Sequence, residues 1–209
     1  AQPSTLAQGC SPSRRVQSPL APYRVLDLSG DAGQFGGKLL GDLGADVVLV
    51  EPPGGCPARH AGPFYHDQPH PERSLSFWAN NTSKRSITLD LTSVTGQETF
   101  KELAREADVV VESFRPGVMA SFGLDYPALE KVNPRLLMAS ISDFGQTGPY
   151  RDFKASDLVL AGMGGSQSGY GVAEKPPLRV ANSVTQYVGG LYALSGILAA
   201  LFVSRKQGI

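Results

Sequence analysis

The chain has 209 residues, of which 41% are hydrophobic, and its 19 basic and 19 acidic side chains give a formal net charge of zero. The length allows a sizeable core, and the balanced charge excludes a bulk electrostatic attraction to nucleic acid or to an anionic membrane surface. The two cysteines, Cys10 and Cys56, lie in Pro-containing segments, which favours a reducing compartment such as the cytoplasm over a disulfide framework.

Residues 1–22 are expected to be a disordered leader. They contain four prolines and no acidic side chain, so neither a strand nor a packed helix is predicted there. Their serine and arginine content is loosely similar to that of an organelle transit peptide, although the prolines break the amphipathic helix of such a peptide. The folded part is therefore predicted to span residues 23–209.

Predicted strands and helices alternate along this folded part. Short apolar runs predict buried strands at 25–28, 47–51, 85–91, 109–111 and 136–141. Helical patterns fill the intervals at 34–43, 96–107 and 125–134. This alternation predicts an α/β fold, a doubly wound parallel sheet with right-handed crossovers.

The ends of two helices are also predicted. Gly44 is expected at the C′ position of the first helix. Either Thr92 or Thr95 is expected to cap the helix over 96–107.

The uncharged run from Val188 to Val203 raises the question of a membrane span. A span needs about 20 apolar residues, whereas this run is shorter, contains three glycines and closes on Arg205 and Lys206. A buried helix in a soluble domain is therefore predicted. The chain stops a few residues later, at Ile209, and is expected to be a fragment.

The loop "GDAGQFGG" after the first predicted strand suggests a dinucleotide site, with Glu51 as the carboxylate for a ribose hydroxyl. Its glycine spacing does not match G-x-G-x-x-G, so a nicotinamide-dependent oxidoreductase is the less favoured alternative. Close packing of the helix on the strand explains Gly36 and Gly37 equally well.

Three histidines, His60, His66 and His70, share one Pro-rich loop. Solvated loop side chains are expected there rather than ligands, and no metal site is predicted. Arg115 follows a predicted strand, at the edge of the sheet where a phosphorylated ligand needs cations.

Asp157, with Ser156 beside it, begins an apolar segment. A helix-capping carboxylate and a chemical role both fit this position. The Gly-, Ser- and aromatic-rich loop after Ile141 follows the last predicted strand, and open α/β sheets bind ligands at the carboxyl ends of their strands.

Four stretches, taken in order, resemble the family III coenzyme A transferases. They are "VLDLSGDAGQFGGKLLGDLGADVVLVEPPGGCPAR", "NNTSKRSITLDLTSVTGQETFKELAREADVVVESFRPGVMASFGLDY", "NPRLLMASISDFGQTGPYRDFKASD" and "GILAALFVSRKQGI". The family includes formyl-CoA, carnitine-CoA and bile-acid-CoA transferases and the 2-methylacyl-CoA racemases. The resemblance runs from about Tyr23 to the last residue.

The resemblance implies a Rossmann-like large domain that a C-terminal segment completes, a small domain between the two parts, and interlocked homodimers. This chain is similar only to the N-terminal half, so its sheet is incomplete in that interpretation. An exposed sheet edge and an exposed apolar helix face are therefore expected.

The resemblance also implies that coenzyme A lies across the carboxyl ends of the strands as a substrate. Its phosphates need cations and backbone amides, and its pantetheine arm needs a narrow apolar groove. The implied CoA-binding residues are Asp31, Ala32, Arg59, Leu89, Thr92, Ser113, Phe114, Arg115, Lys154, Ala155, Ser156 and Asp157.

Gln186 stands where the resemblance places the nucleophile of the transferases. There, an aspartate attacks the acyl thioester, forming first a mixed anhydride and then an enzyme-bound CoA thioester. A neutral amide cannot perform this exchange. The racemases pair that aspartate with a histidine at the position of Ser156, so both members of the proton-transfer pair are absent and a racemase is disfavoured.

Three interpretations follow. The chain is half of a larger transferase whose catalytic aspartate lies in another module, or it is a CoA-binding pseudoenzyme, or Asp157 replaces the missing nucleophile. In the two transferase interpretations the substrates are an acyl-CoA and a carboxylic acid. Neither nucleic acid nor a membrane is an expected partner.

Overall fold

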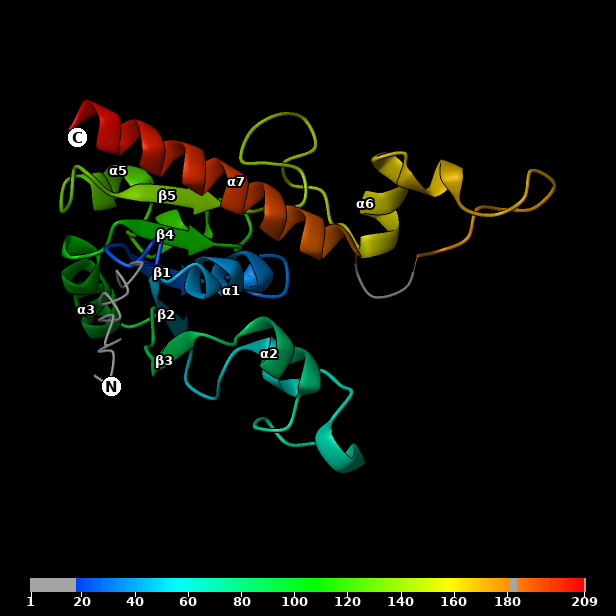
Figure 1. The fold of residues 1–209 in the computed structure, drawn as a ribbon, viewed down its shortest axis with the longest axis horizontal. Coiled ribbons are helices and arrows are strands. Elements are labelled where there is room, and N and C mark those ends of the chain that lie inside the picture. The colour runs from blue at the N-terminus through cyan, green and yellow to red at the C-terminus, as the bar shows by residue number, and fades with distance from the viewer. Residues whose placement is uncertain (1–17, 181–183, 209) are drawn as a thin grey trace, which may run out of the picture.

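The computed structural model describes residues 18–180 and 184–208, which form a five-stranded, all-parallel sheet with helices on both faces (Figure 1). The strand order is β3-β2-β1-β4-β5. The strands are β1 (Arg24–Leu28), β2 (Asp46–Glu51), β3 (Lys84–Thr88), β4 (Val109–Glu112) and β5 (Leu137–Ser140). The predicted α/β, Rossmann-like doubly wound sheet is confirmed, and the strand order reverses between β1 and β4.

Seven helices accompany the sheet within the described residues, and five of them pack against its two faces. They are α1 (Gln34–Asp42), α2 (Leu75–Asn80), α3 (Val94–Arg105), α4 (Val118–Ser121), α5 (Tyr126–Glu130), α6 (Asp157–Met163) and α7 (Val184–Gln207). Three short 3-10 helices join them: η1 (Pro57–His60), η2 (Tyr65–Asp67) and η3 (Ser166–Gly169). Helices α1 and α7 cover one face of the sheet, and α3, α4 and α5 cover the other.

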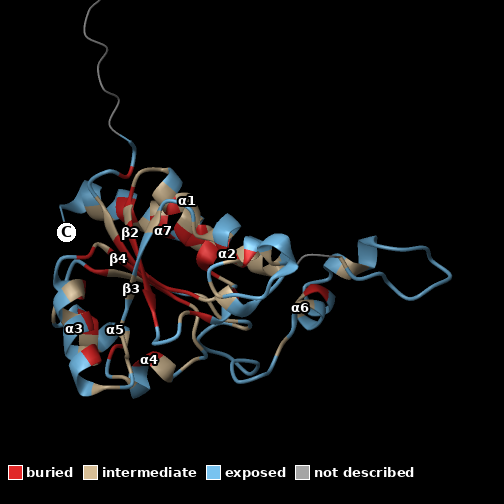
Figure 2. Ribbon diagram, turned by 90° about the horizontal axis from the view of Figure 1, so that it is seen from below, coloured by how far each residue is buried: buried red, intermediate tan, exposed pale blue. Residues whose placement is uncertain are grey.

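The central strands are buried on both faces, which is why they read as continuous apolar runs (Figure 2). Because side chains alternate along a strand, neighbouring residues enter different cores. Val25 packs with Leu40 and Ile197 beneath α1 and α7, whereas Leu26 packs with Phe100 beneath α3. The edge strands β3 and β5 are more exposed.

Helices α1 and α7 cross at two glycines. A Cβ atom on Gly36 would lie 2.7 Å from the carbonyl oxygen of Gly190, and a Cβ atom on Gly37 would lie 2.1 Å from the carboxylate of Asp27 in β1. Close packing of the helix on the strand, predicted for both positions, is thus observed for Gly37. For Gly36 the close neighbour is the second helix.

The prediction of a buried helix over residues 188–203 was wrong in its burial. Helix α7 is 24 residues long, and only Gly190, Ile197 and Leu201 are buried. Its outer face is apolar, with Tyr192 76% and Phe202 68% exposed. By length and composition alone it is able to cross a membrane, yet it packs along the sheet beside α1 and β5.

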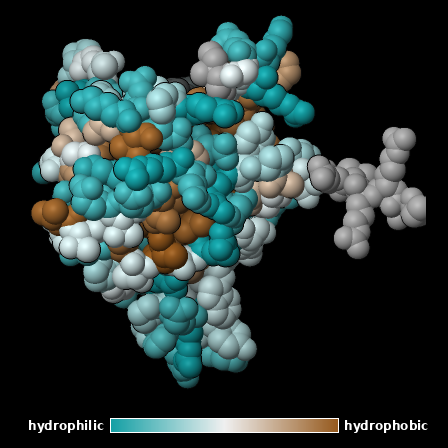
Figure 3. Space-filling view, turned by 90° about the vertical axis from the view of Figure 1, so that its left-hand side faces the viewer, coloured by the Kyte–Doolittle hydropathy of each residue, from teal (hydrophilic) through white to brown (hydrophobic). Residues whose placement is uncertain are grey.

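Apolar surface is also visible at the end of the molecule where α7 finishes, as patches within a mostly polar face (Figure 3). The expected exposure of an apolar helix face is confirmed. The segment 157–180, which precedes α7 in the sequence, extends away from the sheet as an arm that carries α6 and η3 (Figure 1).

Two predicted helix ends and the expected leader can be compared with the structure. Ser93, not Thr92 or Thr95, caps α3, because its Oγ accepts the N–H of Gly96 at 3.0 Å. Gly44 has a φ of +100° after the end of α1, as predicted. Most of the expected leader, with Cys10, lies outside the described residues; of its last five residues, Leu20 is buried in the core beneath α1 and α7.

Candidate functional site

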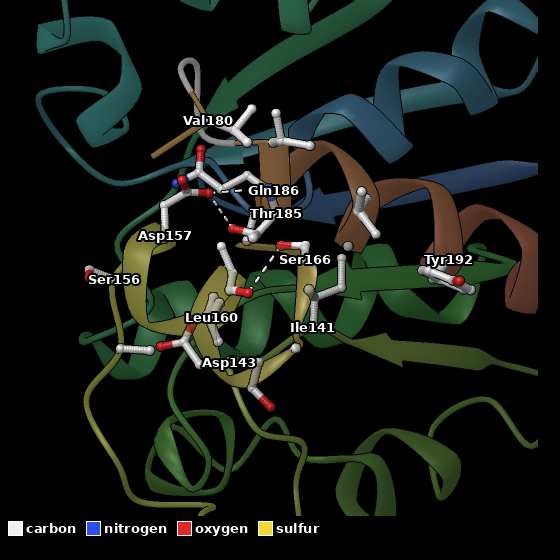
Figure 4. Close-up of a pocket in the computed structure, with 18 of the residues that line it drawn as sticks. Ile141, Asp143, Ser156, Asp157, Leu160, Ser166, Val180, Thr185, Gln186 and Tyr192 are labelled. Atoms are coloured by element: carbon white, nitrogen blue, oxygen red, sulfur yellow. Dashed lines mark hydrogen bonds between the residues drawn. The ribbon is translucent and has the colours of Figure 1, made fainter. Parts of the chain in front are cut away.

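A pocket of about 500 Å³ opens where the carboxyl ends of β1 and β5 meet the N-termini of α6 and α7 (Figure 4). We call it the α6–α7 pocket. Ligands of open α/β sheets bind outside the carboxyl ends of the strands, so the pocket has the expected place for a site. Its lining residues are Ala32, Ile141, Ser142, Asp143, Ala155, Ser156, Asp157, Leu160, Ala161, Gly164, Ser166, Tyr170, Val180, Val184, Thr185, Gln186, Val188, Gly189 and Tyr192.

A second pocket, of about 620 Å³, lies on the other side of the start of α7. We call it the α2–α7 pocket, because α2 and α7 supply most of its polar groups. Its lining residues are Asp31, Ala58, Ala61, Gly62, Pro63, Ser76, Asn80, Gln186 and Tyr187. Gln186 lines both pockets, and it therefore stands at their junction.

The first turn of α7 fixes the place of Gln186. A Cβ atom on Gly189 would lie 3.5 Å from the backbone oxygen of Ala32, so α7 begins close against the loop after β1. The ring of the next residue, Tyr187, packs edge-on against Phe35 of α1, with centroids 5.1 Å apart. Gln186 is thus a half-buried residue on a turn that contacts α1 and the loop after β1.

Asp157 joins the starts of the two helices. Ser156 is the N-cap of α6, and its Oγ accepts the N–H of Val159 at 3.4 Å. Asp157 is the first residue of α6, and its Oδ1 accepts the N–H of Thr185 at 3.2 Å and the Thr185 hydroxyl at 2.5 Å. The capping role considered for Asp157 is therefore real, but the helix that its carboxylate caps is α7.

The charged side chains that line the two pockets are all acidic. Asp143 and Asp157 line the α6–α7 pocket, and Asp31 lines the α2–α7 pocket. Neither lining includes a Lys or Arg side chain among the residues that the structure describes. Such surroundings suit an uncharged arm and a thioester better than a phosphate group.

Arg59 is engaged in an ion-pair network and lines neither of the two pockets. Its guanidinium donates two hydrogen bonds to Glu51, at 2.6 and 2.8 Å, and one to Glu72 at 2.7 Å. It also stacks 4.0 Å over the ring of Phe77. Burial alone raises the pKa of the Glu51 carboxyl, but hydrogen bonds from Arg59, Ser86 and the Cys56 amide outweigh it and lower that pKa to about 2.

Two strand-end residues of the implied CoA set hold loops together. The Ser113 Oγ accepts the N–H of Gly30 at 2.7 Å and so ties the loop after β4 to the loop after β1. Phe114 packs against the core on the α3 side of the sheet, and its N–H donates to Glu112 at 2.7 Å. Burial raises the pKa of the Glu112 carboxyl, although this hydrogen bond and one from Ser140 oppose the shift.

Arg115 lines a third, smaller pocket of about 290 Å³, together with Arg151. This pocket adjoins the carboxyl ends of β4 and β5, where Glu112 and Ser140 also line it. Two guanidinium groups at one edge of the sheet are suited to an anionic group, although the buried Glu112 offsets part of their charge.

The remaining residues of the implied set lie apart from the two pockets that share Gln186. Leu89 is half-buried against the core, and its N–H donates to the oxygen of Glu51 at 2.8 Å. Thr92 is exposed and donates to Asp90. Lys154 is exposed beside the pocket residue Ala155.

The three histidines each make their own local contact. His60 Nε2 lies 3.4 Å from the oxygen of Gly54, the His66 ring is tilted against the Tyr65 ring, and His70 Nδ1 accepts the N–H of Glu72. Within residues 18–180 and 184–208, no group of three or more His, Cys, Asp or Glu side chains is placed to hold a metal ion.

The structure thus brings Ala32, Ala155, Ser156, Asp157 and Gln186 together around one pocket and places Asp31 in the adjoining one. Sequence reasoning missed Thr185, Asn80 and Tyr187. Thr185 and Tyr187 flank Gln186 in sequence, so the Gln186 position itself was the available signal. Asn80 gave none, because helix α2 was not predicted.

Comparisons with known proteins identify the family of the chain. The model of CoA-transferase family III matches residues 20–209. The chain is 42% identical to an acetyl-CoA:oxalate CoA-transferase of Acetobacter aceti, with 93% of this chain and 49% of the relative aligned. It is 39% identical to a succinate–glutarate CoA-transferase of Agrobacterium fabrum, with 91% and 48% aligned.

A solved structure gives the same result for the fold. A CAIB/BAIF family protein from Brucella suis superimposes with a TM-score of 0.86 at 38% identity, and the match covers 92% of this chain and 51% of that protein. The chain therefore spans about half the length of the relatives that it matches.

Proposed function

Because the chain belongs to CoA-transferase family III, we propose that it forms the CoA-binding part of an enzyme that transfers CoA between an acyl-CoA and a carboxylic acid. Two of the relatives named above are an acetyl-CoA:oxalate CoA-transferase and a succinate–glutarate CoA-transferase, and the same reaction class is proposed for the intact protein.

The observation that carries this proposal is the gathering of Ala32, Ala155, Ser156, Asp157 and Gln186 around the α6–α7 pocket. These residues come from three separate segments of the chain, and sequence resemblance implies a CoA-related role for each. The pocket has apolar side chains such as Leu160 and Val188 in its wall, which suits the pantetheine arm. The phosphates of CoA need cations, and the exposed Lys154, next to Ala155, is the nearest candidate in sequence.

Gln186 bears on whether this module can perform the transfer by itself. Transfer through an enzyme-bound thioester requires a carboxylate that attacks the acyl carbonyl, releases the CoA thiolate and then accepts that thiolate on its own carbonyl. The Gln186 amide is not anionic at any working pH. We therefore favour an arrangement in which this module binds CoA and a carboxylate from another module, or another chain, performs the exchange.

Two other assignments compete with this one. In the first, the protein is a CoA-binding pseudoenzyme in which Gln186 is a structural residue. In the second, Asp157 acts as the nucleophile from inside the same pocket. The hydrogen bonds from Thr185 to Asp157 disfavour the second assignment, because they engage one carboxylate oxygen, Oδ1, and hold the side chain toward the start of α7.

The remaining parts of the proposal rest on the family alone. We propose an interlocked homodimer for the intact protein and a cytoplasmic location, with CoA as a substrate and without a metal in the reaction. Arg59, Leu89, Thr92, Ser113, Phe114 and Arg115 stay proposed CoA contacts, and the network around Arg59 makes it a structural residue first.

The test is transfer of CoA by the intact protein. It is incubated with a panel of acyl-CoAs and carboxylic acids, and new acyl-CoA products are measured by chromatography. Formation of a new acyl-CoA supports a transferase, and peptide mass spectrometry of the trapped protein then locates the CoA adduct. CoA binding without any product or adduct favours the pseudoenzyme, and absence of CoA binding removes the proposal.

A further inference from the structure

The two pockets meet at Gln186, so an acyl-CoA bound there would have its CoA arm in one pocket and its acyl group in the other. A thioester carbonyl carries sulfur on one side and the acyl carbon on the other. With the CoA arm in the α6–α7 pocket and the carbonyl at Gln186, the acyl group is directed into the α2–α7 pocket. The chemistry of that second pocket therefore bears on which acyl group the protein accepts.

The α2–α7 pocket has neutral polar groups on a small apolar frame. Ala58, Ala61 and Pro63 supply the apolar part of the wall. Asn80 Nδ2 donates to the Tyr187 hydroxyl at 3.5 Å, at the upper limit for a hydrogen bond. Such a long contact leaves both groups able to bind a ligand instead.

Ser76 also makes only a long hydrogen bond within the protein. Its Oγ donates to the oxygen of Gly62 at 3.5 Å, and it lines the pocket with Asn80 on the same helix. The pocket thus offers an amide, a phenol and an aliphatic hydroxyl, each of which both donates and accepts hydrogen bonds.

The charged side chain that lines the α2–α7 pocket is negative. Asp31 is its single ionisable carboxylate, and no Lys or Arg is among the lining residues that the structure describes. The positive end of the α7 dipole is already opposed by Asp157, which accepts the Thr185 N–H. A free carboxylate at the end of an acyl group would therefore meet Asp31 without a cation to balance it.

We propose that the α2–α7 pocket binds the acyl group and selects an acyl chain with an uncharged hydroxyl over one that ends in a free carboxylate. A hydroxyl can donate to Asp31 or Tyr187 and accept from Asn80, whereas a second carboxylate lacks a cationic partner. The proposal rests on the proposed function, since it requires CoA to occupy the neighbouring pocket.

Binding of stable CoA thioethers to the intact protein tests this. Butyl-CoA, 3-hydroxybutyl-CoA and 3-carboxypropyl-CoA are compared with CoA by calorimetry, because thioethers cannot undergo transfer. The hydroxyl is expected to tighten binding about 5-fold over butyl-CoA, the effect of one net hydrogen bond. The carboxylate analogue is expected to bind more weakly than butyl-CoA.

Three variants sharpen the test. Tyr187→Phe is expected to reduce the preference for the hydroxyl analogue, while Tyr23→Phe, at the opposite end of the strands, leaves it unchanged. Asn80→Lys adds the missing cation and is expected to reverse the order in favour of the carboxylate analogue. This gain of binding distinguishes a changed pocket from a misfolded protein.

The outcomes separate this inference from the proposed function. If CoA itself does not bind, the proposed function fails and the inference fails with it. If CoA binds but the wild-type protein prefers the carboxylate analogue, the inference is wrong and the proposed function stands. The same holds if the substitutions of Asn80 and Tyr187 leave the preference between the analogues unchanged.

Discussion

Asp157 at the start of α6 accepts both the N–H and the hydroxyl of Thr185 at the start of α7, so one carboxylate joins the two helices that frame the pocket. An anion at a helix N-terminus is stabilised by the free N–H groups and by the helix dipole. Asp157 is therefore a positioning residue for the turn that carries Gln186.

Substitutions at Asp157 distinguish this positioning role from a nucleophilic one. Asp157→Ala is expected to lower the free energy of unfolding by roughly 2 kcal/mol, because a charge-assisted hydrogen bond is lost. Asp157→Asn keeps an acceptor oxygen at the same place and is expected to restore most of that stability. Urea denaturation of the intact protein measures both effects.

Activity gives the control for the same pair. If Asp157 only positions α7, Asp157→Asn retains most CoA transfer. Thr185→Val removes the hydroxyl donor but keeps the N–H donor, so it reduces transfer, although less than Asp157→Ala does. Loss of all transfer in Asp157→Asn, with Thr185→Val close to wild type, would instead identify Asp157 as the nucleophile.

The crossing of α1 and α7 is expected to depend on Gly36. An alanine there would bring its Cβ within 2.7 Å of the backbone oxygen of Gly190, and overpacking of this kind costs about 1–3 kcal/mol. Gly36→Ala is therefore expected to lower the thermal unfolding midpoint and to weaken CoA binding, because Gln186 moves with α7.

Gly196 is the matched control on the same helix. A Cβ atom at Gly196 meets nothing within 4 Å, and replacing a helical glycine by alanine stabilises a helix by about 1 kcal/mol. Gly196→Ala is expected to raise the midpoint. Equal effects of the two substitutions would show that the crossing does not require a glycine.

The Glu51–Arg59 pair predicts a pH dependence of stability. The Glu51 pKa falls from 4.5 to about 2 in the folded protein, which corresponds to roughly 3 kcal/mol. A carboxyl with a lowered folded pKa contributes all of this stability above its unfolded pKa. The contribution is lost as the pH falls from 4.5 toward 2.

Glu51→Gln is expected to remove this contribution. The free energy of unfolding of the wild-type protein should exceed that of the variant by roughly 3 kcal/mol at pH 7, and the difference should shrink below pH 4.5. Urea denaturation at pH 7, 5, 4 and 3 measures it. A difference that stays constant down to pH 3 would contradict the lowered pKa.

The strands and the long helices were predictable because their apolar runs are bounded by clear breakers. Val109–Glu112 is buried on both faces, and its first three residues are all valine. The cap of α3 was missed because Thr92, Ser93 and Thr95 all suit an N-cap, and only the turn at Asp90 selects Ser93.

The burial of α7 and the second pocket were not predictable for a physical reason. The sequence of α7 is apolar on all sides, so periodicity carries no information about which face packs on the sheet. The α2–α7 pocket joins Asn80 to Tyr187, two residues 107 positions apart, and a single sequence holds no signal for such a contact.

The central claim is that the thioester of a bound acyl-CoA lies at Gln186, where this module lacks the carboxylate that the exchange requires, and Gln186→Asp tests it most directly. The intact variant is incubated with the acyl-CoA panel and analysed by peptide mass spectrometry, with Gln186→Asn as the control. The account predicts a CoA thioester on the new aspartate at position 186 and none at that position in the wild type or the control. A Gln186→Asp protein that binds CoA but never carries the adduct at position 186 would contradict it.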